Sequence, residues 1–156
     1  MMTRLLLGIG VLIAAIAGAA FYLANTKTSD DAQLFDPVAV EAGRALYAEN
    51  CAACHGVNLE GQPDWRSQNE DGTMPAPPHD SSGHTWHHSD SALFDYTKLG
   101  GAVVMEQLGI EFESGMPSFE GILTDEDINN ILTFIKSTWP EKERVVQAER
   151  TKSEQQ

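Results

Sequence analysis

The residue types best suited to chemistry lie together in the segment Cys51-Ala52-Ala53-Cys54-His55. The chain has no other cysteine, so a disulfide framework is excluded. Two thiols at this spacing suit a thioredoxin-like redox pair, half of a metal site, or covalent attachment of a haem. The adjacent His55 favours haem attachment, because two thiols can add to the vinyl groups of one porphyrin edge while the imidazole binds the iron. A redox dithiol lacks support, because no βαβ pattern surrounds the segment.

Helices are expected on both sides of this segment, together with one long loop. Residues 38–50 favour a helix, and the prolines and glycines of residues 56–88 exclude a long helix there. Residues 89–99 favour a short helix capped by Ser89 or Asp90. Strand patterns are weak throughout, so we expect a mainly α domain over residues 37–140.

The last helix of this domain has the clearest pattern. Thr124 is a good N-cap, and Asp127 follows three residues later. Apolar residues then recur at the spacing of one helical face, at Ile128, Ile131, Leu132 and Ile135. Pro140 ends the helix, and residues 141–156 are expected to form a charged tail, solvated and either helical or disordered.

Over residues 38–140 the chain resembles the class I c-type cytochromes of bacteria. In that family the N-terminal and C-terminal helices cross, and the haem lies between loops. A glycine and an aromatic residue four apart on the first helix, here Gly43 and Tyr47, pack against the last helix. The resemblance assigns the facing positions to Ile131 and Phe134.

The resemblance also implies a ligand set for one covalent haem c. Cys51 and Cys54 would carry the porphyrin, and His55 would be the proximal iron ligand. The sixth ligand of the family is a methionine, commonly followed by proline, and Met116 precedes Pro117, 61 residues after His55.

Two other methionines compete with Met116 for this role. Met74 also precedes a proline, but it lies only 19 residues after His55, and the chain must first pass around the haem edge. Met105 falls in an apolar stretch and is expected in the core.

A proline carbonyl in this family usually accepts a hydrogen bond from the other ring nitrogen of the proximal histidine, which orients the ring. Pro77 and Pro78 both qualify by position, and spacing does not choose between them. Both could instead simply stiffen the loop.

Four histidines crowd into ten residues around Trp86, which departs from the usual family pattern: His79, His84, His87 and His88. One interpretation is a second metal site for copper or zinc, with His84 and His88 on one face. Another has Trp86 and one histidine bonding the haem propionates. A third has one histidine replacing methionine as the distal ligand.

The acidic charge of the chain is concentrated in the expected domain. The formal net charge is −13, and residues 37–140 hold sixteen Asp/Glu against four Lys/Arg, a net of −12. Such a surface repels nucleic acid and anionic lipid and favours redox partners with a basic docking patch. The alternative interpretation is that the charge serves solubility alone.

The N-terminus is expected to carry the chain across a membrane. Residues 5–24 run for 20 positions without a charge, enough for a helix of about 30 Å that spans a bilayer. We favour an uncleaved transmembrane anchor over residues 1–24, followed by a linker over 25–36. Cleavage near Ala17-Gly18-Ala19 is the alternative. Either interpretation places the domain on the periplasmic side of the cytoplasmic membrane.

These features together predict a tethered electron carrier rather than an enzyme. His/Met ligation would raise the reduction potential and leave no open iron position for a small-molecule substrate. By analogy with the family, the partners would be complexes of a respiratory or photosynthetic chain. Two alternatives stay open: a cytochrome subunit of a larger dehydrogenase or oxidase, and a haem- or copper-handling sensor or assembly factor.

Overall fold

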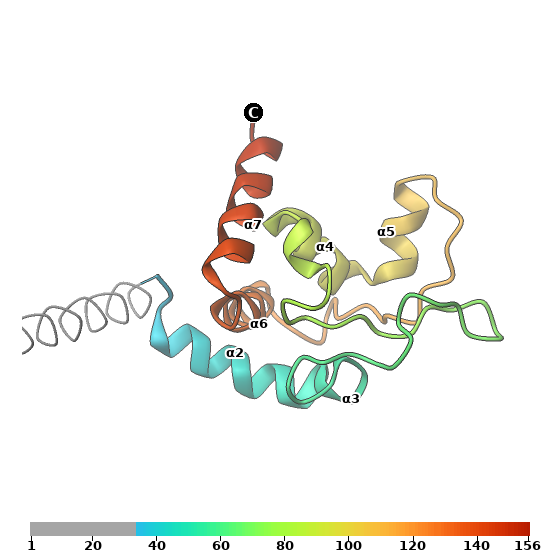
Figure 1. Ribbon diagram of the computed structural model, residues 1–156, viewed down its shortest axis with the longest axis horizontal. Helices are drawn as coiled ribbons and strands as arrows, with labels where there is room; N and C mark the ends of the chain where they lie inside the picture. The colour runs from blue at the N-terminus through green and yellow to red at the C-terminus, as the bar shows by residue number, and fades with distance from the viewer. Residues whose placement is uncertain (1–33) are drawn as a thin grey trace, which may run out of the picture. The chain divides into compact units, whose positions relative to one another are not determined.

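The computed structural model describes residues 34–156, which fold into helices joined by loops, without a strand in this part of the chain (Figure 1). Residues 38–156 form one compact unit. The elements in chain order are α2 (Pro37–Asn50), α3 (Ala52–His55), the 3₁₀ helix η1 (Thr85–His87), α4 (Asp90–Leu99), α5 (Gly101–Gln107), α6 (Asp125–Ser137) and α7 (Glu141–Glu154).

The expected anchor over residues 1–24 and most of the linker lie outside the described residues. Within residues 34–156, no helix has the length and apolar character needed to cross a membrane.

Helix α6 supplies the largest share of the core. Its N-terminus carries the expected cap: the Thr124 hydroxyl accepts from the Asp127 backbone N–H at 3.1 Å, and the Asp127 carboxylate accepts from the Thr124 N–H at 3.0 Å. This reciprocal pair satisfies two backbone donors that the helix cannot bond internally. One face of α6 is buried, with Ile128, Ile131, Leu132 and Ile135 all at most 6 % exposed. Each such side chain contributes about 1.5–3 kcal/mol by leaving water.

Helices α2 and α6 cross in direct contact, as the resemblance predicted. In the view of Figure 1, α6 is seen nearly end-on, whereas α2 runs along the page. A Cβ on Gly43 would lie 1.9 Å from the carbonyl oxygen of Asn130, so only glycine permits this approach. One turn later, the ring centroids of Tyr47 and Phe134 lie 5.5 Å apart, and the Tyr47 hydroxyl donates to the Gly56 carbonyl at 3.0 Å. These contacts fix the position of the C-terminal end of α2, and therefore the position of Cys51, which follows it directly.

We expect Gly43→Ala to destabilise the domain. On a free helix the same change stabilises by up to about 1 kcal/mol, because alanine has the higher helix propensity. At Gly43 the new methyl meets α6 backbone and forces the helices apart, which costs about 1–3 kcal/mol or more. Urea unfolding should show this loss. Gly115→Ala is the matched control, since a Cβ there meets nothing within 4 Å. A Gly43→Ala variant as stable as the native chain would contradict the crossing.

Helix α4 is bounded as the sequence predicts and is surrounded by three other helices. The Ser89 hydroxyl accepts from the Ala92 N–H at 3.2 Å, which caps the helix. At the other end, Gly100 has a φ of +81°, and a new helix, α5, begins directly after it. Helix α4 packs against α5, α6 and α7.

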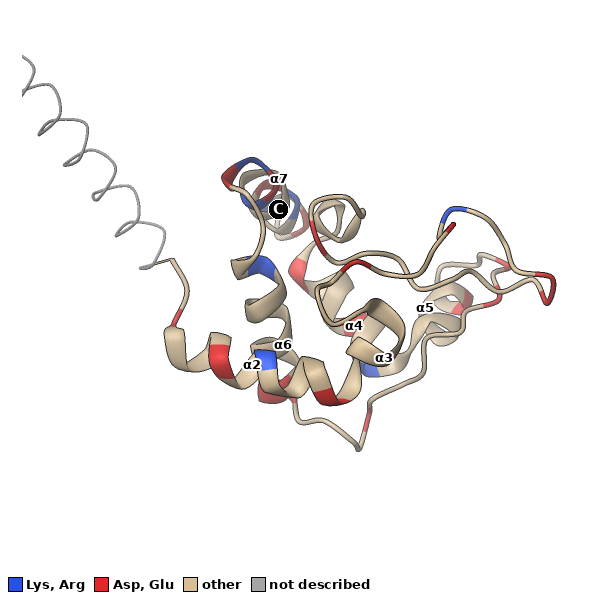
Figure 2. Cartoon of the chain, turned by 60° about the horizontal axis from the view of Figure 1, so that its bottom comes forward, with Lys and Arg blue, Asp and Glu red and all other residues tan. Residues whose placement is uncertain are grey.

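The C-terminal segment takes the helical form, one of the two expected for the charged tail, but it is not fully solvated. Residues 141–154 form α7, which packs against η1 and α4 rather than standing free in solvent. Gln147 is only 4 % exposed, and its amide donates to the Asp90 carboxylate at 2.8 Å. The Asp90 N–H in turn donates to the Thr151 hydroxyl at 3.0 Å. Because α7 carries charged residues of both signs along its length (Figure 2), its sequence gives little sign that uncharged residues among them pack against the domain. The compact unit therefore includes α7, which lies beyond residue 140.

Candidate functional site

The cysteine pair and its histidine lie on a single helical turn that follows α2. Cys51 precedes α3, and its carbonyl accepts from the N–H groups of Cys54 at 3.1 Å and His55 at 2.9 Å. Residues three and four apart lie on one side of a helix, so this turn brings both thiols and the imidazole to the same side. Both cysteines are free; Cys51 is half-buried against the core, and Cys54 is exposed. Burial, and next the neighbouring Cys54, raise the pKa of Cys51 to about 11.

His55 is oriented by the loop that follows it. Its side chain is 8 % exposed, and Nδ1 lies 2.8 Å from the carbonyl oxygen of Pro77. A carbonyl can only accept, so Nδ1 carries the proton and Nε2 keeps its lone pair. Burial lowers the pKa of His55, which favours this neutral ring. Between the two proline candidates the structure gives this contact to Pro77, while the Pro78 carbonyl accepts from the Thr85 hydroxyl at 3.3 Å.

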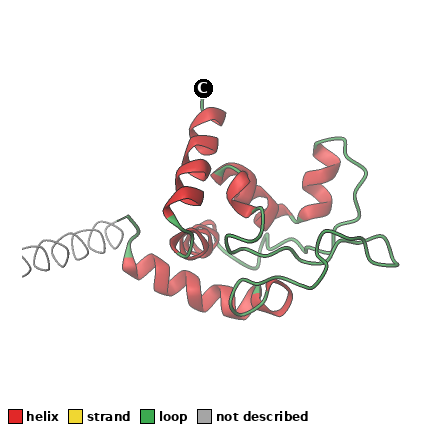
Figure 3. Ribbon diagram, viewed as in Figure 1, coloured by secondary structure: helices red, strands yellow, loops and turns green. Residues whose placement is uncertain are grey.

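The loop over residues 56–84 brings Pro77 to His55 without regular secondary structure (Figure 3). The Gly61 N–H donates to the His55 carbonyl at 2.8 Å, and the Gln62 N–H donates to Ala76 at 2.9 Å. The two ends of the loop segment that contains Met74 are therefore held together, and they are hydrogen-bonded to the turn that carries Cys51, Cys54 and His55.

Met116 lies on a different segment, which is held to the α4–α5 junction. Its carbonyl accepts from the Gly101 N–H at 3.2 Å, and the Ser118 hydroxyl donates to the Lys98 carbonyl at 2.7 Å. A Cβ on Gly100 would lie 2.8 Å from the Ser118 nitrogen, so the close approach also depends on glycine. The Met116, Met74 and Met105 side chains are all half-buried, so burial alone does not choose among them.

Comparison with known families agrees with this geometry. The family model described as cytochrome c matches residues 40–139, from the second turn of α2 to the end of the α6 region. The chain belongs to the cytochrome c family. No curated protein and no solved structure matches it. This cytochrome accordingly carries covalent haem c and serves haem-based electron transfer.

The residues of this cytochrome fit the haem that its family binds. Two free thiols and an unprotonated imidazole nitrogen lie on one turn, as the attachment and the proximal bond require. Trp86 adds a second sign of fit: its indole N–H is buried and has no acceptor within residues 34–156. A buried donor without a partner costs about 1–3 kcal/mol, and a haem propionate would supply the missing acceptor.

The four histidines do not form one cluster. His79 is half-buried, with its ring stacked on His55 at 4.0 Å between centroids. The ring of His84 stacks on that of Trp65, with 5.2 Å between their centroids, and its centroid lies 5.3 Å from that of His88. Across residues 34–156, no group of three His, Cys, Asp or Glu side chains could hold a metal ion. The second metal site at His84 and His88 therefore stays a prediction without a third protein ligand in this part of the chain.

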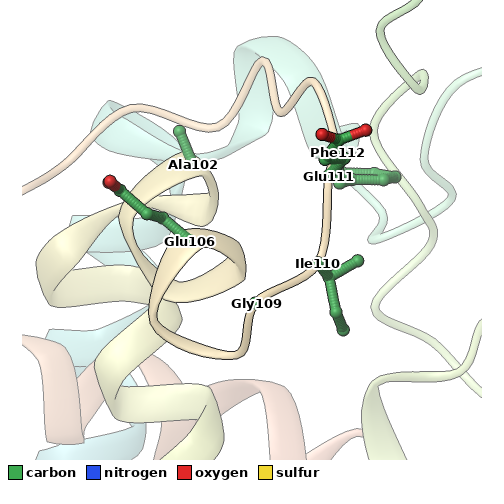
Figure 4. A pocket seen from close by; sticks show the side chains of 6 residues that line it. All are labelled: Ala102, Glu106, Gly109, Ile110, Glu111 and Phe112. Atoms are coloured by element: carbon green, nitrogen blue, oxygen red, sulfur yellow. The ribbon is translucent and has the colours of Figure 1, made fainter.

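A shallow hollow lies elsewhere, between α5 and the segment that follows it. Figure 4 shows its lining, which consists of Ala102, Glu106, Gly109, Ile110, Glu111 and Phe112. None of these residues is a predicted haem contact. Sequence reasoning did not single them out, and it also missed Trp65 and Thr85, because the contacts of all these residues depend on how the loops fold.

Proposed function

We propose that this cytochrome is a class I, monohaem electron carrier that is tethered on the periplasmic side of the cytoplasmic membrane. It passes single electrons between membrane-associated redox proteins. The observation that carries the proposal is His55: a neutral imidazole, oriented by Pro77 at 2.8 Å, directly after two free thiols. The family match over residues 40–139 supports the electron-carrier part of the proposal.

Each residue of the proposed site has one task. Bound haem iron supplies the one-electron redox chemistry. Cys51 and Cys54 would hold the porphyrin by thioether bonds, and His55 would bind through Nε2 while Pro77 keeps its ring in place. Met116 would supply a soft thioether as the second protein ligand, which favours the ferrous state and a positive potential. Two protein ligands would leave no open position on the iron, which suits electron exchange rather than turnover of a substrate.

The partners we propose carry basic docking patches. Seven Asp/Glu and no Lys/Arg occur between Leu99 and Ile135, which includes the Met116 segment. The hollow beside α5 carries Glu106 and Glu111 next to Ile110 and Phe112, which are 50 % and 37 % exposed. Apolar contact surrounded by acidic charge complements a basic partner, which long-range attraction would bring to the surface.

Electron exchange should therefore depend on the charge of the reagent. We expect the ferrous protein to reduce the cation tris(phenanthroline)cobalt(III) several-fold more slowly when salt is raised from about 0.01 M to about 0.15 M, because the Debye length falls from about 30 Å to about 8 Å. The rate with the anion hexacyanoferrate(III) should rise instead. Stopped-flow absorbance measures both.

A pair of charge variants locates the effect. Glu106→Gln with Glu111→Gln should reduce the salt dependence with the cation, whereas Glu149→Gln, exposed on the charge-balanced α7, should not. Equal salt dependence in all three proteins would contradict a docking role for the α5 surface.

Fractionation of bacteria that express the full chain tests the tether. Covalent haem should remain with the membranes after a high-salt wash and be released when residues 1–24 are deleted behind a cleavable export signal. Protease added to the periplasmic side should degrade the haem-bearing domain. Release of the intact chain by salt alone would refute the anchor, and stable co-purification with a large enzyme would favour the role of a complex subunit.

A further inference from the structure

The ring of His79 lies face to face with the ring of His55. Their centroids are 4.0 Å apart, and their planes differ by 21°. His79 thus has a different ring partner from His84, which contacts Trp65 and His88. The ring that His79 covers is the one that binds the iron.

His79 is itself held at three points. Its Nδ1 lies 2.9 Å from the Thr85 hydroxyl, which donates its own proton to the Pro78 carbonyl at 3.3 Å. The Thr85 oxygen is then the acceptor, so His79 carries its proton on Nδ1. The His79 N–H donates to the Leu59 carbonyl at 2.8 Å, and the His79 carbonyl accepts from the Trp139 indole at 2.7 Å. Trp139 is 1 % exposed, so this attachment is to the core.

Two residues of one loop therefore restrain the same imidazole in different directions. Pro77 holds Nδ1 of His55 within the plane of the ring, and this single hydrogen bond leaves tilting and twisting of the plane free. His79 covers a face of the ring and opposes those motions. A partner that only filled volume would restrain the plane less, because two flat rings have one preferred separation.

We propose that His79 is a positioning residue for the haem ligand His55: it sets the plane of the His55 imidazole and excludes water from the face that it covers. The inference rests on the covalent haem of the family and not on the tether or the partners proposed above. Outer contacts of this kind orient metal-bound histidines and tune the metal. Excluding water also disfavours the more highly charged ferric state, so His79 raises the reduction potential.

The test uses the full chain with haem attached, in four variants. The readouts are the spread of haem methyl shifts in the ferric proton NMR spectrum, which reports the direction of the axial imidazole plane, and the midpoint potential. His79→Ala should change the methyl pattern and shift the potential to a more negative value. His79→Phe keeps a flat ring and should stay close to the native protein in both readouts.

The remaining two variants are controls. His79→Leu fills space without a plane, and should resemble His79→Ala in the methyl pattern. His84→Ala removes an imidazole of the same segment that contacts Trp65, and should change neither readout. A native methyl pattern in His79→Ala, or in His79→Leu to the same degree as in His79→Phe, would overturn the proposal. If His79→Ala retains no haem, the comparison of Phe with Leu decides alone.

Discussion

Met116→Ala is expected to convert the iron from low spin to high spin. Removing the thioether leaves His55 as the one protein ligand, and a weakly bound water in the sixth position splits the d orbitals less. The potential should fall by a sizeable share of the roughly 0.8 V that axial ligands can span, because the soft ligand that favours the ferrous state is lost. The ferrous variant should also bind carbon monoxide, which the native protein should resist. Visible spectra in both oxidation states report the spin change, a ferrous spectrum under carbon monoxide reports its binding, and a spectrophotometric redox titration gives the potential.

The competing methionines are the controls for this assignment. Met74→Ala and Met105→Ala should leave the spectrum unchanged, although both side chains are half-buried, as that of Met116 is. What favours Met116 is its backbone: the segment is tied to Gly101 and Lys98, and a ligand needs a fixed distance from the iron. A high-spin Met74→Ala protein with a native Met116→Ala spectrum would move the ligand to the loop after α3.

The elements of the fold were predictable where the signal is local. The Thr124–Asp127 capping box and the apolar spacing from Ile128 onward are complete within the sequence of α6 itself. The same holds for the α4 cap at Ser89. Such signals survive in one sequence because capping and amphipathic spacing act between residues at most four positions apart.

The features that could not be predicted depend on contacts between distant segments. The sequence of α7 predicts a solvated tail, because the residues by which α7 packs against α4, Gln147 and Thr151, are uncharged and lie among charged neighbours. The choice of Pro77 over Pro78 and the separation of His79 from His84 both follow from the path of an irregular loop. No periodicity encodes that path; it is fixed by single hydrogen bonds such as the one from His79 to Leu59.

The candidate site divides in the same way. Cys51, Cys54 and His55 could be assigned from their spacing, because one helical turn is enough to position all three. The ring that covers His55 and the unpartnered indole of Trp86 required the structure, because each depends on what the loop over residues 56–84 brings next to it.

Replacing the cysteines should separate attachment from binding. In Cys51→Ser/Cys54→Ser, no thioether can form, so we expect all haem to be extracted by acid–acetone from the denatured protein, whereas none leaves the native chain. Haem staining of a denaturing gel measures the same loss. The noncovalent pocket persists, since His55 keeps its Pro77 contact, so the variant should still bind added haem with low-spin character.

The single variants should differ from each other, because the two thiols lie in different surroundings. Cys54 is exposed, so Cys54→Ser removes one thioether and little else, and the haem should stay attached through Cys51. Cys51 packs against the core, so Cys51→Ser also places a hydroxyl among apolar side chains and should cost about 1–3 kcal/mol of stability in addition. Equal stability of the two single variants would show that the burial of Cys51 contributes nothing beyond its bond. Haem that stays attached in the double variant would exclude these thiols as the attachment points.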